Sequence, residues 1–161
     1  MATIDLEKFY IYGEGLRGPK DKNSAIVHTK ASELKNKLRT TPKKAGIFLG
    51  MDIARKKHLS VISLLEKIGE IKFTRMIFVL EKCPFWVQEK FLYTIISGTG
   101  VRRSCIDSTG IGAQLAENCV YRYGKSAVEE INFSNSVKEE LATDIKTELE
   151  NRRVILPTSK V

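Results

Sequence analysis

The order of the predicted elements constrains the fold of this chain more than any other feature of the sequence. Three segments with the length and aliphatic content of β-strands follow one another, at residues 46–52, 59–67 and 72–81. The short connection at residues 68–71 predicts that the second and third strands form an antiparallel hairpin. Helices and strands alternate after residue 84, which predicts parallel strands joined by helical crossovers. We therefore expect a mixed sheet covered by helices.

The alternating half of the chain has recognisable start and stop signals. Pro84 precedes an apolar helical stripe, and Gly98 and Gly100 end it. Next we expect a strand at 101–106, a helix at 111–123, a strand at 127–133, a helix from Ser134 or Asn135 to about residue 152, and a short strand at 154–156. With the five main strands numbered in chain order, we expect the sheet order 3-2-1-4-5. This order is that of a ribonuclease-H-like α/β fold, in which helices flank a mixed five-stranded sheet.

Composition divides the chain into two parts. Residues 1–45 contain ten lysines or arginines against five acids, and they include GEGLRGPKDKNS, which is rich in turn formers. We interpret residues 1–45 as a basic N-terminal arm or linker with one short helical candidate at 31–39, and residues 46–161 as the folded body. An arm that is simply a solvated surface explains the charge equally well.

Overall composition is that of a globular protein with an anionic partner. Hydrophobic residues make up 42% and charged residues 29%, and the net charge is +8. No apolar run approaches the roughly 20 residues of a membrane span, and the N-terminus lacks a signal-peptide core. The three cysteines form no CxxC pair, so a disulfide scaffold and a cysteine-rich zinc site are poor interpretations. A cytoplasmic location fits best.

Two of the expected strands end in an aspartate. Asp52 closes the first strand and Asp107 follows the fourth, and the order 3-2-1-4-5 makes these strands parallel neighbours. Their carboxylates would then lie roughly 5 Å apart and repel each other unless a cation intervenes. Oxygen ligands of this kind suit Mg²⁺ or Mn²⁺, and such an ion supports phosphodiester hydrolysis. Each aspartate alone is equally explained as a turn former or as a helix N-cap.

Five sequence segments together resemble the nuclease domain of phage terminase large subunits, most closely the Mu-like phage type. The segments are LGMDIARKKHLSV (49–61), CIDSTGIGAQLA (105–116), INFS (131–134), KEEL (138–141) and RRVILP (152–157). The resemblance covers residues 46–157 and implies a ribonuclease-H-like endonuclease that cuts phage or prophage DNA for packaging with Mg²⁺ or Mn²⁺. Asp52 and Asp107 match the two metal-binding, catalytic aspartates, and Lys138 matches a basic residue near the active site. Arg55, Lys56 and Lys57 follow Asp52 and would bind DNA phosphates.

The chain departs from the family pattern at three points. His58 stands where many members carry another aspartate, and the third metal-binding acid of the family lies in a later helix, so the domain is expected to be truncated at its C-terminus. The last expected helix carries a row of acids largely along one face, but an amphipathic surface helix explains them as well: Glu139, Glu140, Asp144 and Glu148. No P-loop is found, so we expect no ATPase activity.

Several functions remain open at this point. The resemblance implies double-stranded DNA as the substrate, and it implies as partners a separate packaging ATPase, a small terminase subunit and a portal. The first alternative is a catalytically impaired domain of the same fold that binds DNA or a packaging partner. The second is another ribonuclease-H-like nuclease, either a resolvase or an RNA–DNA hybrid nuclease.

Overall fold

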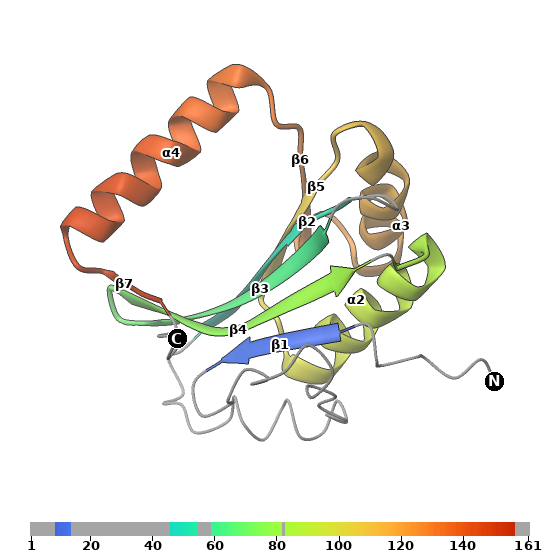
Figure 1. Ribbon diagram of the computed structural model, residues 1–161, viewed down its shortest axis with the longest axis horizontal. Helices are drawn as coiled ribbons and strands as arrows, with labels where there is room; N and C mark the ends of the chain where they lie inside the picture. Colours follow the sequence, from blue (N-terminus) through green and yellow to red (C-terminus); the bar gives the residue numbers. More distant parts are fainter. Residues whose placement is uncertain (1–8, 14–45, 55–58, 82, 157–161) are drawn as a thin grey trace.

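A computed structural model describes residues 9–13, 46–54, 59–81 and 83–156 of the chain (Figure 1). The elements in chain order are β1 (Phe9–Gly13), β2 (Gly46–Asp52), β3 (Leu59–Ile68), β4 (Ile71–Glu81), α2 (Phe85–Thr99), β5 (Arg103–Asp107), the 3₁₀ turn η2 (Gly110–Gly112), α3 (Ala113–Tyr123), β6 (Val128–Ile131), α4 (Asn135–Glu150) and β7 (Val154–Ile155). None of the helices in these ranges combines the length and the apolar character needed to cross a membrane.

The strands form one mixed sheet with the order β1-β4-β3-β2-β5-β6, and β7 pairs with β4. β3 pairs antiparallel with both β2 and β4, whereas β5 runs parallel to β2 and to β6. The predicted hairpin, the predicted order of the five main strands and the ribonuclease-H-like fold class are confirmed. The short strand before Pro157 is also present, as β7.

An additional strand comes from the part of the chain that we interpreted as an arm. β1 pairs antiparallel with β4 over its whole length, from Phe9 opposite Leu80 to Gly13 opposite Met76. The sequence analysis did not predict this strand. The division of the chain at residue 45 stays a prediction, and the helical candidate at residues 31–39 lies outside the described residues.

One face of the sheet carries the hydrophobic core, and α2 and α3 cover it (Figure 1). Alternate residues of the central strands are buried there, as the two-residue period of a strand requires. Ile62, Leu64 and Phe78 are completely buried, and the ring of Phe78 packs edge-on against Phe91 of α2 at 5.3 Å between centroids. This face therefore provides a rigid base for the ends of β2 and β5.

The opposite face is covered much less. α4 crosses it at a distance from the sheet, and no residue of α4 is buried (Figure 1). Contacts at its two ends hold the helix. Ser134 caps the start by accepting a hydrogen bond from the Val137 amide, and Lys72 of β4 pairs with Glu148 near the end. The sequence predicted a helix here and its cap, but only the structure shows that it stands away from the sheet.

Candidate active site

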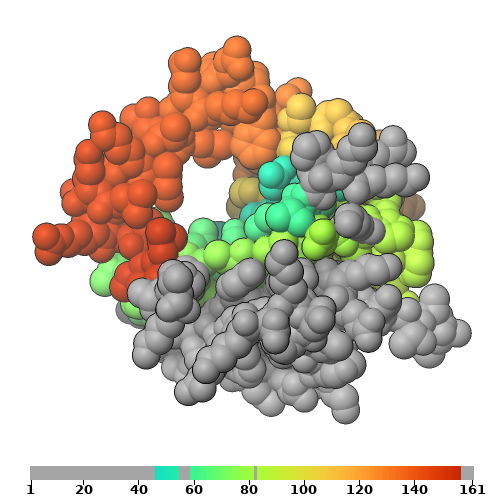
Figure 2. All heavy atoms as spheres, in the orientation of Figure 1, coloured from blue at the N-terminus to red at the C-terminus, as the bar shows by residue number. Residues whose placement is uncertain are grey.

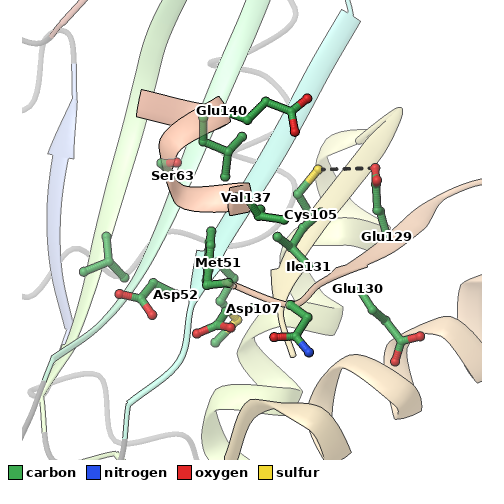
Figure 3. A pocket seen from close by; sticks show the side chains of 15 residues that line it. Met51, Asp52, Ser63, Cys105, Asp107, Glu129, Glu130, Ile131, Val137 and Glu140 are labelled. Carbon is green, nitrogen blue, oxygen red and sulfur yellow. Dashed lines mark hydrogen bonds between the residues drawn. The ribbon is translucent and has the colours of Figure 1, made fainter. Parts of the chain in front are cut away.

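Asp52 and Asp107 end two neighbouring parallel strands. Met51 of β2 lies opposite Ile106 of β5, so the next residue of each strand is the aspartate. Both side chains line the same cavity and lie next to each other (Figure 3). The predicted adjacency of the two strands is confirmed, and with it the meeting of the two carboxylates at the carboxyl edge of the sheet.

The electrostatics of the pair favour a cation. Partial burial raises the pKa of Asp52 above its usual range, and the charge of Asp107 raises this pKa further. A hydrogen bond from the Ile53 amide lowers the pKa, but the net shift is upward. The charge of Asp107 thus destabilises the ionised form of Asp52, and a divalent cation between the two carboxylates would remove that repulsion.

A network of backbone hydrogen bonds fixes Asp107. Its Oδ1 accepts a hydrogen bond from the Thr109 amide at 2.7 Å, and Thr109 Oγ1 accepts one from the Phe133 amide at 3.0 Å. The Ser108 amide donates to the Ile131 carbonyl at 2.9 Å. These bonds join the turn after β5 to the turn after β6, so the carboxylate of Asp107 has a defined position before any ligand binds.

Glycines make the turn after Asp107 possible. Gly110 has a φ of 57°, a conformation that side-chain-bearing residues rarely adopt. At Gly112, a Cβ atom would lie 2.2 Å from the Asp107 carbonyl oxygen. The chain can enter α3 this close to the end of β5 only because position 112 has no side chain. The expected tight turn from strand to helix is confirmed in this form.

Two buried polar side chains hold the backbone that follows Asp52. Ser60 Oγ accepts a hydrogen bond from the Ala54 amide at 2.8 Å and donates one to the Ala54 carbonyl at 3.1 Å. Gln88 of α2 donates to the carbonyls of Ala54 and Cys83. Neither residue was predicted from the sequence. The available signal was a polar residue at a core-facing position of an otherwise apolar strand or helix.

The cavity beside the aspartates lies between the sheet and α4 and measures about 720 Å³. Its described lining comes from β2, β3, β5, β6 and α4, and it includes five acids but no lysine or arginine. The acids are Asp52, Asp107, Glu129, Glu130 and Glu140. Arg103 pairs with Glu129 at 2.7 Å, and Glu140 directs its carboxylate away from the aspartates (Figure 3). Within the described residues no third acid, cysteine or histidine joins the aspartate pair as a candidate metal cluster.

The donor set nevertheless fits a hard divalent cation. Mg²⁺ in proteins is often held by only one or two carboxylates, with water and substrate phosphate as the other ligands. Asp52 and Asp107 supply that number, and they approach a position open to solvent, since the side chain of Asp52 is exposed. Their assignment as metal ligands and catalytic residues stays a prediction.

The other predicted site residues are distributed differently. Arg55, Lys56, Lys57 and His58 lie outside the described residues. Lys138 is an exposed residue of α4 and does not line the cavity, although its neighbour Val137 does. Of the acids on α4, only Glu140 lines the cavity, and Glu148 pairs with Lys72 near the other end of the helix. The DNA-binding role of the basic residues is therefore still a prediction.

Comparison with solved structures shows which proteins share this architecture. The large terminase nuclease from thermophilic phage G20c with bound zinc superposes with a TM-score of 0.62 and 21% identity, over 74% of this chain and 67% of that one. The chain has the fold of a large terminase nuclease. The magnesium-bound G20c nuclease gives a TM-score of 0.62 at 20% identity, over 72% of this chain and 60% of that one. The cobalt-bound form gives a TM-score of 0.61 at 17% identity, over 81% of this chain and 75% of that one.

The relationship to terminase nucleases is structural. No protein-family model and no curated protein matches the sequence. The chain spans between 60% and 75% of the length of the three G20c nuclease structures. At identities of 17–21% the shared feature is the fold, and the function of the chain has to be argued from its own residues.

Proposed function

We propose that this chain is a divalent-metal-dependent DNA endonuclease of the terminase type. The observation that carries the proposal is the pair Asp52 and Asp107, which meets at the ends of touching parallel strands in a terminase nuclease fold. Mg²⁺ and Mn²⁺ are the proposed cofactors, and the solved G20c nucleases with magnesium, zinc and cobalt support a divalent cation in this fold. Residues 46–161 would form the nuclease domain.

Asp52 and Asp107 would hold the metal. When bound, a divalent ion lowers the pKa of water and stabilises the charge that develops on a phosphate during hydrolysis. Asp107 provides a fixed ligand, because the Thr109 amide and the connection to Phe133 restrain it. Asp52 would provide the second ligand: burial and the charge of Asp107 raise its pKa, and a cation at the site would favour its ionised form. Water and a DNA phosphate would complete the coordination.

The substrate has to approach against an acidic surface. The five carboxylates that line the cavity repel DNA, so the phosphate backbone would reach the site at the solvent-exposed edge near Asp52. We propose that Arg55, Lys56, Lys57 and Lys138 neutralise phosphates there. Contacts of this kind give binding that is independent of base sequence and weakens steeply with salt. The net charge of +8 supports a nucleic-acid substrate of this kind.

The wider setting follows from the same proposal. A terminase nuclease cuts DNA for packaging, so we propose double-stranded phage DNA as the substrate. A separate packaging ATPase, a small terminase subunit and a portal are the proposed partners. A second candidate is a domain of this fold that binds DNA or a packaging partner without cutting, and one observation favours it: among the described residues no third acid joins the pair.

A plasmid-nicking assay with Mn²⁺ or Mg²⁺ separates the two candidates. We expect the full chain to nick supercoiled DNA, and Asp52→Asn and Asp107→Asn to lose that activity while they still bind DNA. Glu130→Gln is the matched control, because this carboxylate lines the same cavity but lies apart from the pair (Figure 3). Equal nicking by all four proteins would refute the assignment of the aspartates. Inactivity of the parent with retained DNA binding would favour the second candidate.

Additional substrates test the remaining alternatives within the fold class. Four-way junctions and RNA–DNA hybrids are offered in the same assay alongside linear duplex DNA. Preferential cutting of a junction would indicate a resolvase, and preferential cutting of a hybrid would indicate a hybrid nuclease. The terminase proposal expects efficient cutting of ordinary duplex DNA.

A further inference from the structure

α4 has an apolar stripe that the rest of the described structure does not cover. Hydrophobic residues recur every four positions along its 16 residues, at Val137, Leu141, Ile145 and Leu149. Leu141, Ile145 and Leu149 are 45%, 49% and 44% exposed. A helix of this length is marginal by itself in water, and helices normally gain stability from packing an amphipathic face. The stripe therefore indicates a missing packing partner.

The surface across from the stripe is a partly apolar sheet face. Val137 and Leu141 line the cavity from α4, and Gly50, Val61 and Ile131 line it from the sheet. Figure 2 shows an opening between α4 and the sheet, with chain on both sides. An apolar helix stripe and an apolar sheet face thus form the two walls of one groove. We call this cavity and the exposed remainder of the stripe the α4 groove.

The charge of the α4 groove defines its occupant. The described lining contains five acids and no basic residue. α4 itself adds three further exposed acids and two exposed lysines, so its own charge stays acidic: Glu139, Asp144, Glu150, Lys138 and Lys146. Even when a metal neutralises Asp52 and Asp107, Glu130 and Glu140 remain at the opening without a basic residue in the lining. A cationic segment would complement this charge, and nucleic acid would be repelled.

We propose that the α4 groove is the docking site for a cationic amphipathic helix of a partner protein. The helix would place aliphatic side chains at i, i+4 and i+7 against the stripe and the sheet, and lysines or arginines beside Glu130 and Glu140. α4 is about 24 Å long at 1.5 Å per residue, so a partner helix of about four turns matches it. A second copy of this chain fits less well, because two α4 helices would bring the same acids together.

This inference goes beyond the proposed nuclease activity, and its test needs neither metal nor DNA. The probe is a fluorescein-labelled 16-residue helix of leucine and lysine in an amphipathic pattern, titrated with the full chain and followed by fluorescence anisotropy. We expect saturable binding with one peptide per chain. A peptide with glutamate in place of every lysine is expected to bind at least tenfold more weakly.

Variants of the stripe locate the binding. The double variant Leu141→Gln with Ile145→Gln removes apolar surface but keeps helix propensity, and we expect it to weaken peptide binding at least tenfold. Thr143→Gln is the matched control, because Thr143 lies on the opposite side of α4 and is exposed, and we expect unchanged affinity. Glu130→Gln with Glu140→Gln is expected to weaken binding and to reduce its dependence on salt. All these side chains are exposed, so circular dichroism should show an intact fold in each variant.

Three outcomes would overturn the proposal. The first is the absence of saturable binding by the parent chain. The second is equal affinity of the parent and the Leu141→Gln, Ile145→Gln variant. The third is a dimer, detected by light scattering, that the same double variant dissociates, since that would assign the groove to a second copy of the chain. Because plasmid nicking is measured separately, an inactive nuclease would leave the result of the peptide titration intact.

Discussion

Replacing Gly112 by alanine tests whether the turn after β5 positions Asp107. A Cβ at position 112 would lie 2.2 Å from the Asp107 carbonyl oxygen, 3.2 Å from the carbonyl carbon and 3.3 Å from Ile53 Cδ1. Two of these three atoms belong to the backbone of β5, so no rotamer change can relieve the contact. The start of α3 has to move away from the strand, and the turn that holds the carboxylate moves with it.

The size of the effect follows from the close contact. Forcing an extra methyl group into a packed site destabilises a protein by about 1–3 kcal/mol. Each kcal/mol lowers Tm by about 2–4 °C in a protein of this length, so we expect a fall of about 2–12 °C in thermal unfolding followed by circular dichroism. A displacement of the order of 1 Å at a catalytic group reduces rates about 100-fold. We therefore expect nicking to fall by about that factor at temperatures where the variant is fully folded.

Gly50→Ala is the matched control for this substitution. Gly50 lies on β2 in the wall of the same cavity, and a Cβ there meets nothing closer than Ser63 Oγ at 3.4 Å, which is an ordinary contact. We expect an unchanged or slightly higher Tm, because alanine loses less conformational freedom on folding than glycine. A Gly112→Ala protein as stable and as active as the parent would refute the reasoning about the turn.

Three further predictions concern the aspartate pair and α4. Without metal, Asp52→Asn should be more stable than the parent at neutral pH. The pKa of Asp52 is raised in the folded state, so this state holds the proton more tightly than the unfolded state does. Ionisation of Asp52 therefore lowers the stability of the parent as pH rises from about 4 through the folded-state pKa. Chemical denaturation at several pH values measures this, and a difference that persists at pH 3 would contradict it. Mn²⁺ should raise the Tm of the parent but not of Asp107→Asn, which thermal unfolding over a metal titration checks; an equal rise in both would exclude Asp107 as a ligand. Lys72→Ala should speed hydrogen exchange in the C-terminal half of α4 and leave the core strands unchanged, because it removes the contact with Glu148 that holds this end. An unchanged exchange rate there would show that this contact does not anchor the helix.

The two faces of the sheet differ in how far helices cover them. α2 and α3 cover one face, which carries the hydrophobic core beneath the ends of β2 and β5. The α4 side is open, and it contains the cavity, the acids and the apolar stripe. The proposed metal chemistry and the proposed partner binding therefore both use the open side, and the core side supports the strand ends that carry the aspartates.

Local sequence signals were enough to predict most of the central fold. Alternating apolar residues, Pro84, Gly100 and Ser134 determined where strands and helices begin and end, because caps and periodicity act over a few residues. The position of Asp52 and Asp107 at strand ends was equally visible, and the order of elements was enough to make their strands neighbours. The pairing of β1 with β4 was not visible, since it joins residues about 65 positions apart and depends on an edge that only the finished sheet presents.

The amino-acid sequence by itself determined the elements, the central strand order and the two carboxylates that meet at the edge of the sheet. Tertiary structure decided which polar residues support them. Ser60 reaches Ala54 because β3 pairs with β2, and Gln88 reaches it because α2 packs beneath the end of β2. It also decided that α4 stands away from the sheet. The periodicity of a helix shows which residues share a face, but whether that face is covered depends on contacts between distant parts of the chain.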